Sequence, residues 1–357
     1  MKFSVIIPLY NKAPYVRKAL ESVFAQTYAD YELIIIDDGS TDDSCAIADE
    51  FVREAMGNGL WAIDEENEVK GYRLEVQGDE NSGAETNAYK LLPINYKLIR
   101  QANSGVSAAR NNGVAASSGD YVAFLDADDW WEPTYLEQMA KLIEDYPDAG
   151  LYASNYIYYK PGKTRVAVSN IETGYFNYPK AYYESNAMPI WTGAALIPRE
   201  VLKETGGFPL GIKLGEDFLL WAKIAMHYPV AFINEALAWY NNDVPATLRA
   251  TRNLHAPEHN MLFNLGRLGD EAMRREAKGD DWQMLIDKLR VNSLLEYWIS
   301  KEYHNQAAEE LKKVDWSNQP DSVKRIYKTP IWILKLMRLI MRWGSYVKQK
   351  IIRRMRR

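Results

Sequence analysis

Four short runs of apolar residues alternate with helical patterns over the first 125 residues of the chain. The apolar runs lie at residues 2–9, 31–36, 96–99 and 121–125. Each run has the length of a buried β-strand and is bounded by polar or turn-forming residues. Residues 13–26 repeat apolar side chains at the spacing of one helical face, and residues 104–116 predict a small-residue helix capped by Ser104. Continuous apolar strands separated by helices predict an α/β fold, with a mostly parallel sheet covered on both faces.

Acidic side chains directly follow two of these predicted strands. Asp37 and Asp38 follow the second strand, and three acids within residues 126–129 follow the fourth. Because ligands of such sheets bind beyond the carboxyl ends of the strands, both acidic groups are expected at one site. Closely packed carboxylates repel one another, and a divalent cation with oxygen ligands is the simplest compensation. The alternative is a solvated acidic turn that caps the helix starting near Pro133.

Four segments of the sequence together resemble glycosyltransferase family 2. They are SVIIPLYN at 4–11, ELIIIDDGSTDDS at 32–44, RQANSGVSAARNNGVAASSGDYVAFLDADD at 100–129 and GED at 215–217. The segments occur in the order of the family's motifs and cover roughly the first two-thirds of the chain. The resemblance implies the GT-A fold, which is Rossmann-like, and an inverting transferase that uses a nucleotide-activated sugar.

The resemblance also implies roles for five residues of the donor side. Pro8 and Tyr10 would line the pocket for the base, and Asp38 would accept hydrogen bonds from the nucleobase or the ribose. Asp126 would reach the ribose or the surroundings of the metal, and Asp128 would bind a divalent metal, Mg²⁺ or Mn²⁺, on the diphosphate. These residue types suit the chemistry, because carboxylates accept hydrogen bonds strongly and a metal neutralises charge on the leaving diphosphate.

Asp217, in the GED segment, is the general base that the resemblance implies. A sugar hydroxyl is a poor nucleophile, so a positioned carboxylate has to take its proton. From its spacing alone, Asp217 is also explained as an acid at the N-terminus of the helix that starts there. Glu216 is then a structural or substrate-orienting neighbour. Arg100 and Arg110 could reach phosphates or pair with the clustered acids, and we favour pairing. Arg249 and Arg252 are candidates for phosphate contacts.

The chain is expected to form a catalytic domain at residues 1–240 and a helical region at 241–357. The catalytic domain would comprise a nucleotide-sugar half at 1–130 and an acceptor half at 131–240. The acceptor half is rich in aromatic residues, whose faces suit sugar rings and whose polar tips bind hydroxyls. Most of these rings are expected to serve packing, and Trp191 is the candidate for a contact with the acceptor.

The connection at residues 55–93 is longer than the family usually has between these two strands. Long connections without strong periodicity are functional lids or insertions, and we interpret this one as a surface insertion. Within it, residues 72–76 (YRLEV) alternate between polar and apolar side chains and predict a strand that pairs with a neighbour.

Charge is unevenly distributed along the chain. The net charge is −5, yet residues 323–357 contain 12 Lys and Arg and no acid, which leaves 31 basic against 48 acidic residues elsewhere. Residues 331–343 place Lys335, Arg338 and Arg342 on one helical face and large apolar side chains on the others. This segment is too short and too charged to span a membrane, but it suits a helix in an anionic membrane interface. The alternative is a helix docked on the protein itself.

These features predict a non-processive glycosyltransferase that works at the inner face of the cell membrane. A UDP-sugar is the favoured donor, and the acceptor would be a hydroxyl of a glycan or of a lipid-linked sugar in cell-surface polysaccharide assembly. Processive relatives carry a Gln-x-x-Arg-Trp motif, whereas Leu339 precedes Arg342-Trp343 at the matching position here. The single cysteine, Cys45, excludes an internal disulfide framework and fits the cytoplasm. The acidic body argues against nucleic-acid binding.

Two other classes of protein remain as alternatives. One is a non-catalytic, membrane-associated protein that binds nucleotide sugars or helps assembly. The presence of all of Asp38, Asp128 and Asp217 argues against a decayed site. The other is a nucleotidyltransferase, which would need a glycine-rich basic loop after the first strand to hold a triphosphate, and residues 8–12 form no such loop.

Overall fold

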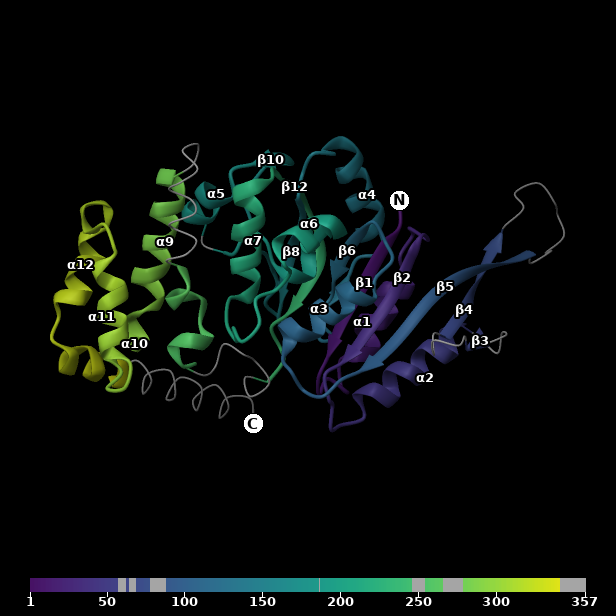
Figure 1. Ribbon diagram of the computed structural model, residues 1–357, viewed down its shortest axis with the longest axis horizontal. Coiled ribbons are helices and arrows are strands. Elements are labelled where there is room, and N and C mark those ends of the chain that lie inside the picture. The colour runs from purple at the N-terminus through teal and green to yellow at the C-terminus, as the bar shows by residue number, and fades with distance from the viewer. Residues whose placement is uncertain are drawn as a thin grey trace. The chain divides into compact units, whose positions relative to one another are not determined.

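The computed structural model describes residues 1–56, 62–63, 69–77, 88–185, 187–245, 254–265 and 279–340, with backbone alone for residues 62–63, 69–77 and 88–94. The chain divides into two units, Met1–Arg252 and Asn253–Arg357. The first unit is built around a β-sheet flanked by helices, and the described part of the second is helical (Figure 1).

Among the described residues, the strands of the first unit form one 12-stranded sheet. The strands are β1 Phe3–Leu9, β2 Tyr31–Asp37, β3 Ala62–Ile63, β4 Val69–Gln77, β5 Ala88–Arg100, β6 Tyr121–Phe124, β7 Trp130–Trp131, β8 Leu151–Tyr159, β9 Arg165–Val166, β10 Gly174–Phe176, β11 Ala195–Pro198 and β12 Val230–Asn241. Their order is β10-β12-β8-β11-β6-β1-β2-β5-β4-β3, with β7 paired to β12 and β9 paired to β8.

The part of the sheet that the apolar runs predicted is parallel. β1 pairs in parallel with both β2 and β6, and β2 pairs in parallel with β5. All seven residues of β2 are buried, as expected for a strand covered on both faces. Because these strands run in the same direction, the residues that follow β1, β2, β5 and β6 meet at one edge. β11 runs antiparallel to both β6 and β8 and joins the two halves of the sheet.

Seven α-helices flank this sheet among the described residues of the first unit. They are α1 Val16–Phe24, α2 Ser44–Met56, α3 Val106–Ala116, α4 Tyr135–Asp145, α5 Tyr178–Glu184, α6 Arg199–Thr205 and α7 Glu216–His227. The apolar face predicted within residues 13–26 is confirmed, since Val16, Ala19, Leu20 and Val23 are all buried in α1. The helix begins only at Val16, because residues 13–15 form a turn.

The predicted cap of α3 is wrong. Gly105, with a φ of 88°, precedes the first helical residue, and no side chain caps the helix. The Ser104 hydroxyl instead donates to the Ala102 carbonyl at 2.8 Å. The small residues of α3 do allow a close approach to the sheet, because a Cβ on Gly113 would come within 2.4 Å of Ile6.

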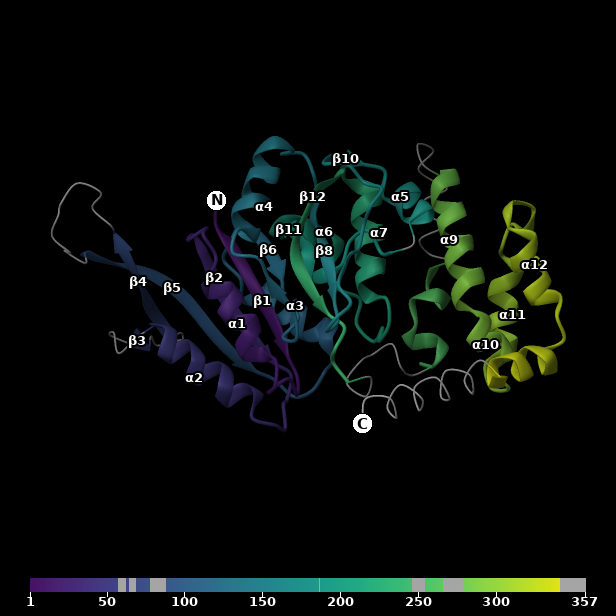
Figure 2. The same cartoon turned by 180° about the vertical axis from the view of Figure 1, so that it is seen from behind.

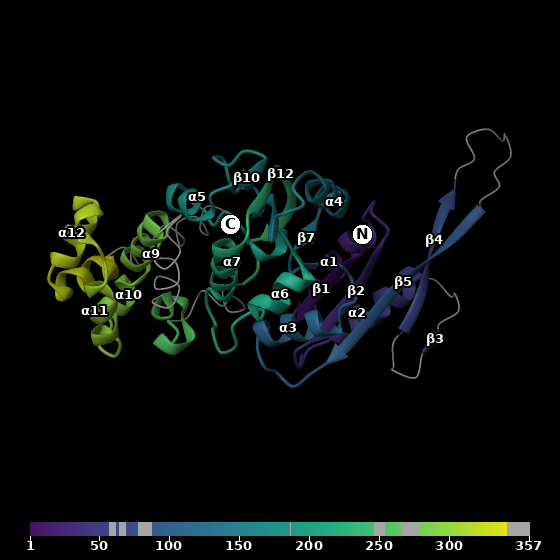
Figure 3. The same ribbon diagram turned by 45° about the horizontal axis from the view of Figure 1, so that its top comes forward.

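The strand predicted at residues 72–76 is confirmed as part of β4. It pairs antiparallel with β3 on one side and with β5 on the other. Figure 3 shows β4 and β5 side by side, with their far ends running out past β1 and β2. This segment therefore extends the edge of the sheet.

The second unit contains the helices that follow residue 278 (Figure 2). They are α9 Gly279–Ser293, α10 Leu295–Ile299, α11 His304–Lys312 and α12 Asp321–Lys328, followed by a helix at 331–340. A buried ion network holds α9 to α11, with Arg290 at 3.6 Å from Asp287 and 3.3 Å from Glu310. Within the described residues, no helix is long and apolar enough to cross a membrane.

Candidate active site

A pocket of about 490 Å³ lies at the carboxyl ends of the parallel strands in the first unit. Six of the residues singled out from the sequence line it together, namely Pro8, Tyr10, Asp38, Asp126, Asp128 and Glu216. They come from the ends of β1, β2 and β6 and from the start of α7, which are far apart along the chain. The topology thus brings these side chains to one site, as the positions of the acids predicted.

Asp38 is buried at one side of this pocket and is held by the loop that follows β5. Its Oδ1 accepts from the Gln101 side chain and from the Ser104 backbone N–H, both at 2.7 Å. Its Oδ2 accepts from the Gly105 backbone N–H at 2.9 Å. Each carboxylate oxygen can accept about two hydrogen bonds, so Oδ2 retains capacity for one more donor. The loop fixes the carboxylate and leaves that acceptor for a ligand.

Arg110 is the buried cation of the site and bridges two of its acids. Its Nη2 lies 2.8 Å from Asp126 Oδ1, and its Nη1 lies 3.0 Å from Glu216 Oε1. Burial by itself would lower the pKa of Arg110, but Asp126 and Glu216 outweigh it and raise the pKa above its ordinary value. The expected pairing of Arg110 with the clustered acids is confirmed, and it fixes Asp126 against the first turn of α7. Arg100 instead donates from its Nε to Cys45 Sγ at 3.1 Å.

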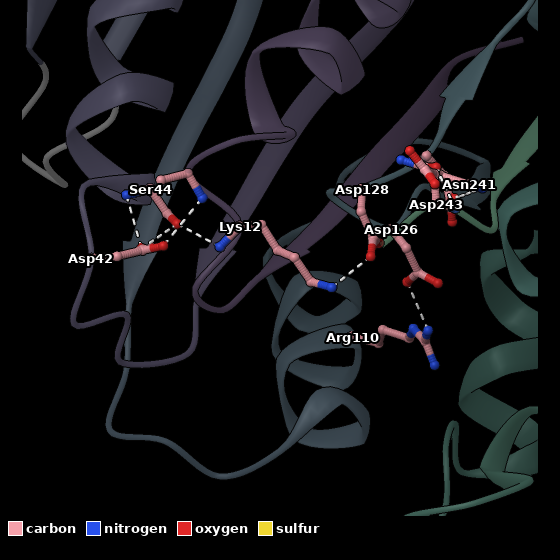
Figure 4. A network of polar contacts seen from close by, with 10 residues as sticks. Lys12, Asp42, Ser44, Arg110, Asp126, Asp128, Asn241 and Asp243 are labelled. Atoms are coloured by element: carbon pink, nitrogen blue, oxygen red, sulfur yellow. Dashed lines mark hydrogen bonds and ion pairs between the residues drawn. The ribbon is translucent and has the colours of Figure 1, made fainter. Parts of the chain in front are cut away.

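Lys12 provides the second cation. Its Nζ lies 2.5 Å from Asp128 Oδ2, and both side chains are less than one-fifth exposed. Figure 4 shows Asp126 and Asp128 side by side, with Arg110 and Lys12 directed toward them. Burial raises the pKa of Asp128, although Lys12 opposes this change. Two cations of the chain therefore already compensate acids for which the sequence suggested a metal as the simplest partner.

Asp129, the last acid of the motif, has a structural role. It is only 2 % exposed, and its carboxylate accepts from the Asn241 backbone N–H at 2.6 Å. Burial, followed by the neighbouring Asp128 and Asp126, raises its pKa well above the ordinary value. The hydrogen bond holds the end of β12, with Tyr240 and Asn241, against the pocket that these two residues line.

Asp217 lies in the first turn of α7, beside Glu216 but outside the lining of the pocket. It accepts hydrogen bonds from the Thr192 hydroxyl at 3.2 Å and from the Phe218 backbone N–H at 2.7 Å. Burial, and after it the neighbouring Glu216, raise the pKa of Asp217 to about 6, although Arg110 acts in the opposite direction. A carboxylate whose pKa lies this close to neutrality is suited to general base catalysis.

Trp191 lies one residue before Thr192, in the aromatic half of the unit. It is only 5 % exposed, and its ring centroid lies 5.3 Å from that of Tyr156 and 5.2 Å from that of Tyr240. Trp191 therefore supports Tyr240, which lines the pocket together with Tyr10. Arg249 and Arg252 lie outside the described residues.

Lys12 also lines the pocket, although it was not singled out from the sequence. Lys12 follows the family-like segment at 4–11 directly, so its position was a usable signal. β12 brings Tyr240 and Asn241 to the pocket through its pairing with β8 and the bond from Asp129.

Comparisons with known proteins agree with these observations. The sequence model of glycosyl transferase family 2 matches residues 4–70 and 78–206. The chain is 30% identical to "Glycosyltransferase GlyA" of Streptococcus pneumoniae over 252 residues, which are 67% of this chain and 30% of the relative. It is 32% identical to "Putative glycosyltransferase EpsH" of Bacillus subtilis over 180 residues, which are 50% of this chain and 41% of the relative. The chain thus spans less than half the length of either relative.

A solved structure shares the fold. TarS 1–349 of S. aureus, in complex with UDP-GlcNAc, superimposes with a TM-score of 0.65 at 17% identity, over 91% of this chain and 84% of the other. This likeness confirms the predicted GT-A type of α/β fold.

Proposed function

Because the chain belongs to glycosyl transferase family 2, we propose that it transfers a sugar from a nucleoside diphosphate donor to an acceptor hydroxyl, with inversion. The observation that carries this proposal is the pocket that gathers Asp38, Asp126 and Asp128 beside the start of α7. The proposed acceptor is a glycan or a lipid-linked sugar in cell-surface polysaccharide assembly, and transfer is non-processive. A UDP-sugar is the first donor to test, since TarS, whose fold the chain shares, has been solved with UDP-GlcNAc.

The donor nucleotide would lie across the ends of β1 and β2. Pro8 and the half-exposed Tyr10 offer apolar contacts to a base, and the remaining acceptor on Asp38 Oδ2 suits an N–H or hydroxyl group of the nucleoside. The diphosphate would extend toward Asp126 and Asp128, where Lys12 supplies a positive charge. In this arrangement the sugar would lie next to the first turn of α7.

A divalent metal would be held here by the protein and the substrate together. Among the residues that the structure describes, no three His, Cys, Asp or Glu side chains converge on a point that could hold an ion. Asp128 would bind the metal, with Asp126 nearby, and phosphate oxygens would complete its ligands, which is the mode common for Mg²⁺. The metal would neutralise charge on the leaving diphosphate. Lys12 would have to leave the Asp128 oxygen that it now occupies.

Asp217 would act as the base on the acceptor. Its carboxylate takes the proton of the acceptor hydroxyl while that oxygen bonds to the anomeric carbon and the bond to the diphosphate breaks. Glu216 forms an ion pair with Arg110, whereas Asp217 accepts a hydrogen bond from Thr192, which lies in the aromatic half of the unit. A single displacement of this kind inverts the anomeric configuration.

Product stereochemistry tests this scheme without knowledge of the acceptor. When water replaces the acceptor, we expect a UDP-sugar with an α-linkage to release the free β-sugar first. Proton NMR of the anomeric signals, recorded before mutarotation, would detect it. Initial release of the α-sugar would rule out a single displacement, and spontaneous hydrolysis without protein serves as the control.

The helix at 331–340 supports a further part of the proposal, which is peripheral attachment to an anionic membrane surface at the inner face of the cell membrane. Its exposed apolar side chains, from 49% to 67% exposed, are Trp332, Leu336, Met337, Leu339 and Ile340. Arg338 pairs with Glu296, so the helix also contacts its own unit. Exposed apolar side chains next to basic ones are typical of interfacial helices. The basic segment predicted at 323–357 begins inside α12.

Removal of the apolar surface is expected to abolish membrane attachment. We predict that the double variant Trp332→Glu, Leu339→Glu no longer floats with vesicles of phosphatidylcholine and phosphatidylglycerol, because the helix loses apolar area and gains negative charge. The matched control is Asn305→Glu, Ser322→Glu, which adds the same charge at exposed polar positions of the same unit. Equal flotation of both variants would refute the attachment through this helix.

A further inference from the structure

A second cavity, of about 510 Å³, lies within the helical unit. Trp298, Trp316 and Tyr327 form its aromatic walls, and Lys312, Lys324 and Lys328 also line it. No acidic side chain is among its lining residues, all of which belong to the described part of the chain. The proposed transferase reaction, whose residues lie in the first unit, makes no use of this cavity.

The aromatic walls are fixed by contacts among themselves and with the backbone. The centroid of the Tyr327 ring lies 5.5 Å from the centroid of the Trp316 ring and 5.9 Å from that of Trp298, and both pairs are edge-to-face. The Tyr327 hydroxyl donates to the Val291 carbonyl at 2.7 Å, and Trp316 Nε1 donates to the Leu311 carbonyl at 3.2 Å. Since the polar tips of Tyr327 and Trp316 are already paired, their rings offer mainly apolar surface to the cavity.

The lysines at this cavity form only weak ion pairs within the chain. Lys312 lies 2.6 Å from Glu309, but both side chains are about two-thirds exposed. Lys324, whose side chain is 28% exposed, lies 3.7 Å from the exposed Asp321, and its Nζ also donates to the Ser317 carbonyl at 3.4 Å. An ion pair with an exposed partner contributes little, and the two contacts of Lys324 are long, so both ammonium groups can turn to a stronger anionic partner. The whole unit from 253 to 357 has 21 Lys and Arg against 13 Asp and Glu, and its positive charge favours such a partner.

We propose that this cavity binds the phosphate-bearing headgroup of an anionic lipid. The lysines would bind the phosphate, and the aromatic walls would contact the glycerol and the first methylenes of the chains. Trp, Tyr and Lys are the side chains that proteins place at membrane interfaces. A lipid is favoured over a soluble polyanion because the helix at 331–340, in the same unit, exposes a row of large apolar side chains. This inference rests on the proposed attachment to the membrane and gives it a specific site.

Calorimetric titration with dihexanoyl phosphatidic acid, below its micelle concentration, tests the site without a membrane. We expect saturable binding of one lipid per chain, and at least tenfold weaker binding of inorganic phosphate and of dihexanoyl phosphatidylcholine. Inorganic phosphate that binds as tightly as the lipid would overturn the lipid assignment. Stronger binding of an oligogalacturonate would overturn it in favour of an acidic glycan.

Charge-matched variants distinguish lipid binding at this cavity from nonspecific electrostatic attraction between the lipid and the basic unit. Lys324→Gln, Lys328→Gln should weaken lipid binding at least tenfold, because two of the three ammonium groups at the phosphate are lost. The control Arg325→Gln, Lys335→Gln removes the same charge from exposed positions that do not line the cavity, and it should change the affinity less than twofold. An equal loss in both pairs would overturn the proposal. The readout involves neither the donor pocket nor flotation, so its failure is distinguishable from failure of the proposed function.

Discussion

Asp217→Asn is expected to lower kcat by about 10²- to 10⁴-fold, the usual contribution of a general base. Donor affinity should stay close to that of the wild type, because Asp217 does not line the donor pocket. The measured quantity is the rate at which the enzyme releases nucleoside diphosphate from a nucleotide sugar that it accepts as donor. Glu216→Gln is the matched control. Since Glu216 is occupied by Arg110, its replacement should lower kcat less, and the reverse order of the two variants would contradict the assignment of the base.

The same residue predicts a dependence on pH. Because the base must be deprotonated and its pKa is raised to about 6, wild-type kcat should fall as pH decreases below about 6. The raised pKa also means that the folded chain holds this proton more tightly than the unfolded chain does. Asp217 therefore disfavours the folded state at neutral pH, by at most about 3 kcal/mol. Asp217→Asn should be more stable than the wild type at pH 7.5, and urea denaturation should show this difference shrinking as pH falls from 6 to 4.

Arg110→Met is expected to destabilise the fold by about 3–5 kcal/mol, the cost of breaking a buried ion pair. The variant leaves Asp126 and Glu216 without the buried cation that now bridges them at 2.8 and 3.0 Å. Urea denaturation at pH 7.5 measures the free energy of unfolding. Arg53→Met is the control, because Arg53 pairs with Asp49 on an exposed helix surface and should cost less than about 1 kcal/mol. Similar losses in the two variants would contradict the bridging role of Arg110.

The elements that the sequence predicted best are those defined by local patterns. The apolar runs at 2–9, 31–36 and 121–125 became β1, β2 and β6, because continuous apolar strands are stable only when buried on both faces. The helical face within 13–26 was also predicted from a local pattern, because apolar side chains repeat there at the spacing of one helical face. The predicted cap at Ser104 was wrong because a long-range hydrogen bond determines the local structure before α3. The backbone N–H of Ser104 bonds to Asp38, which lies 66 residues earlier in the chain.

The sequence predicted that the acids after β2 and β6 would meet at one edge of the sheet, but it predicted their pairing only in part. The acids at the strand ends identified this edge, and Asp38, Asp126 and Asp128 line one pocket there. The bridge from Arg110 to Glu216 spans 106 residues, and the pair of Lys12 with Asp128 spans 116. Neither spacing follows a local rule, so the sequence favoured Arg110 as a partner of the acids but did not identify Glu216 as its second partner or Lys12 as the partner of Asp128.

Calorimetric titration with UDP, GDP, CMP and TDP, with and without Mn²⁺, tests the central claim most directly, which is that the pocket at the strand ends binds a nucleotide donor. We expect one of these nucleotides to bind in the presence of Mn²⁺ and the binding to be lost in Asp128→Ala. The absence of binding for all four nucleotides, or binding that Asp128→Ala leaves unchanged, would contradict the donor site proposed here.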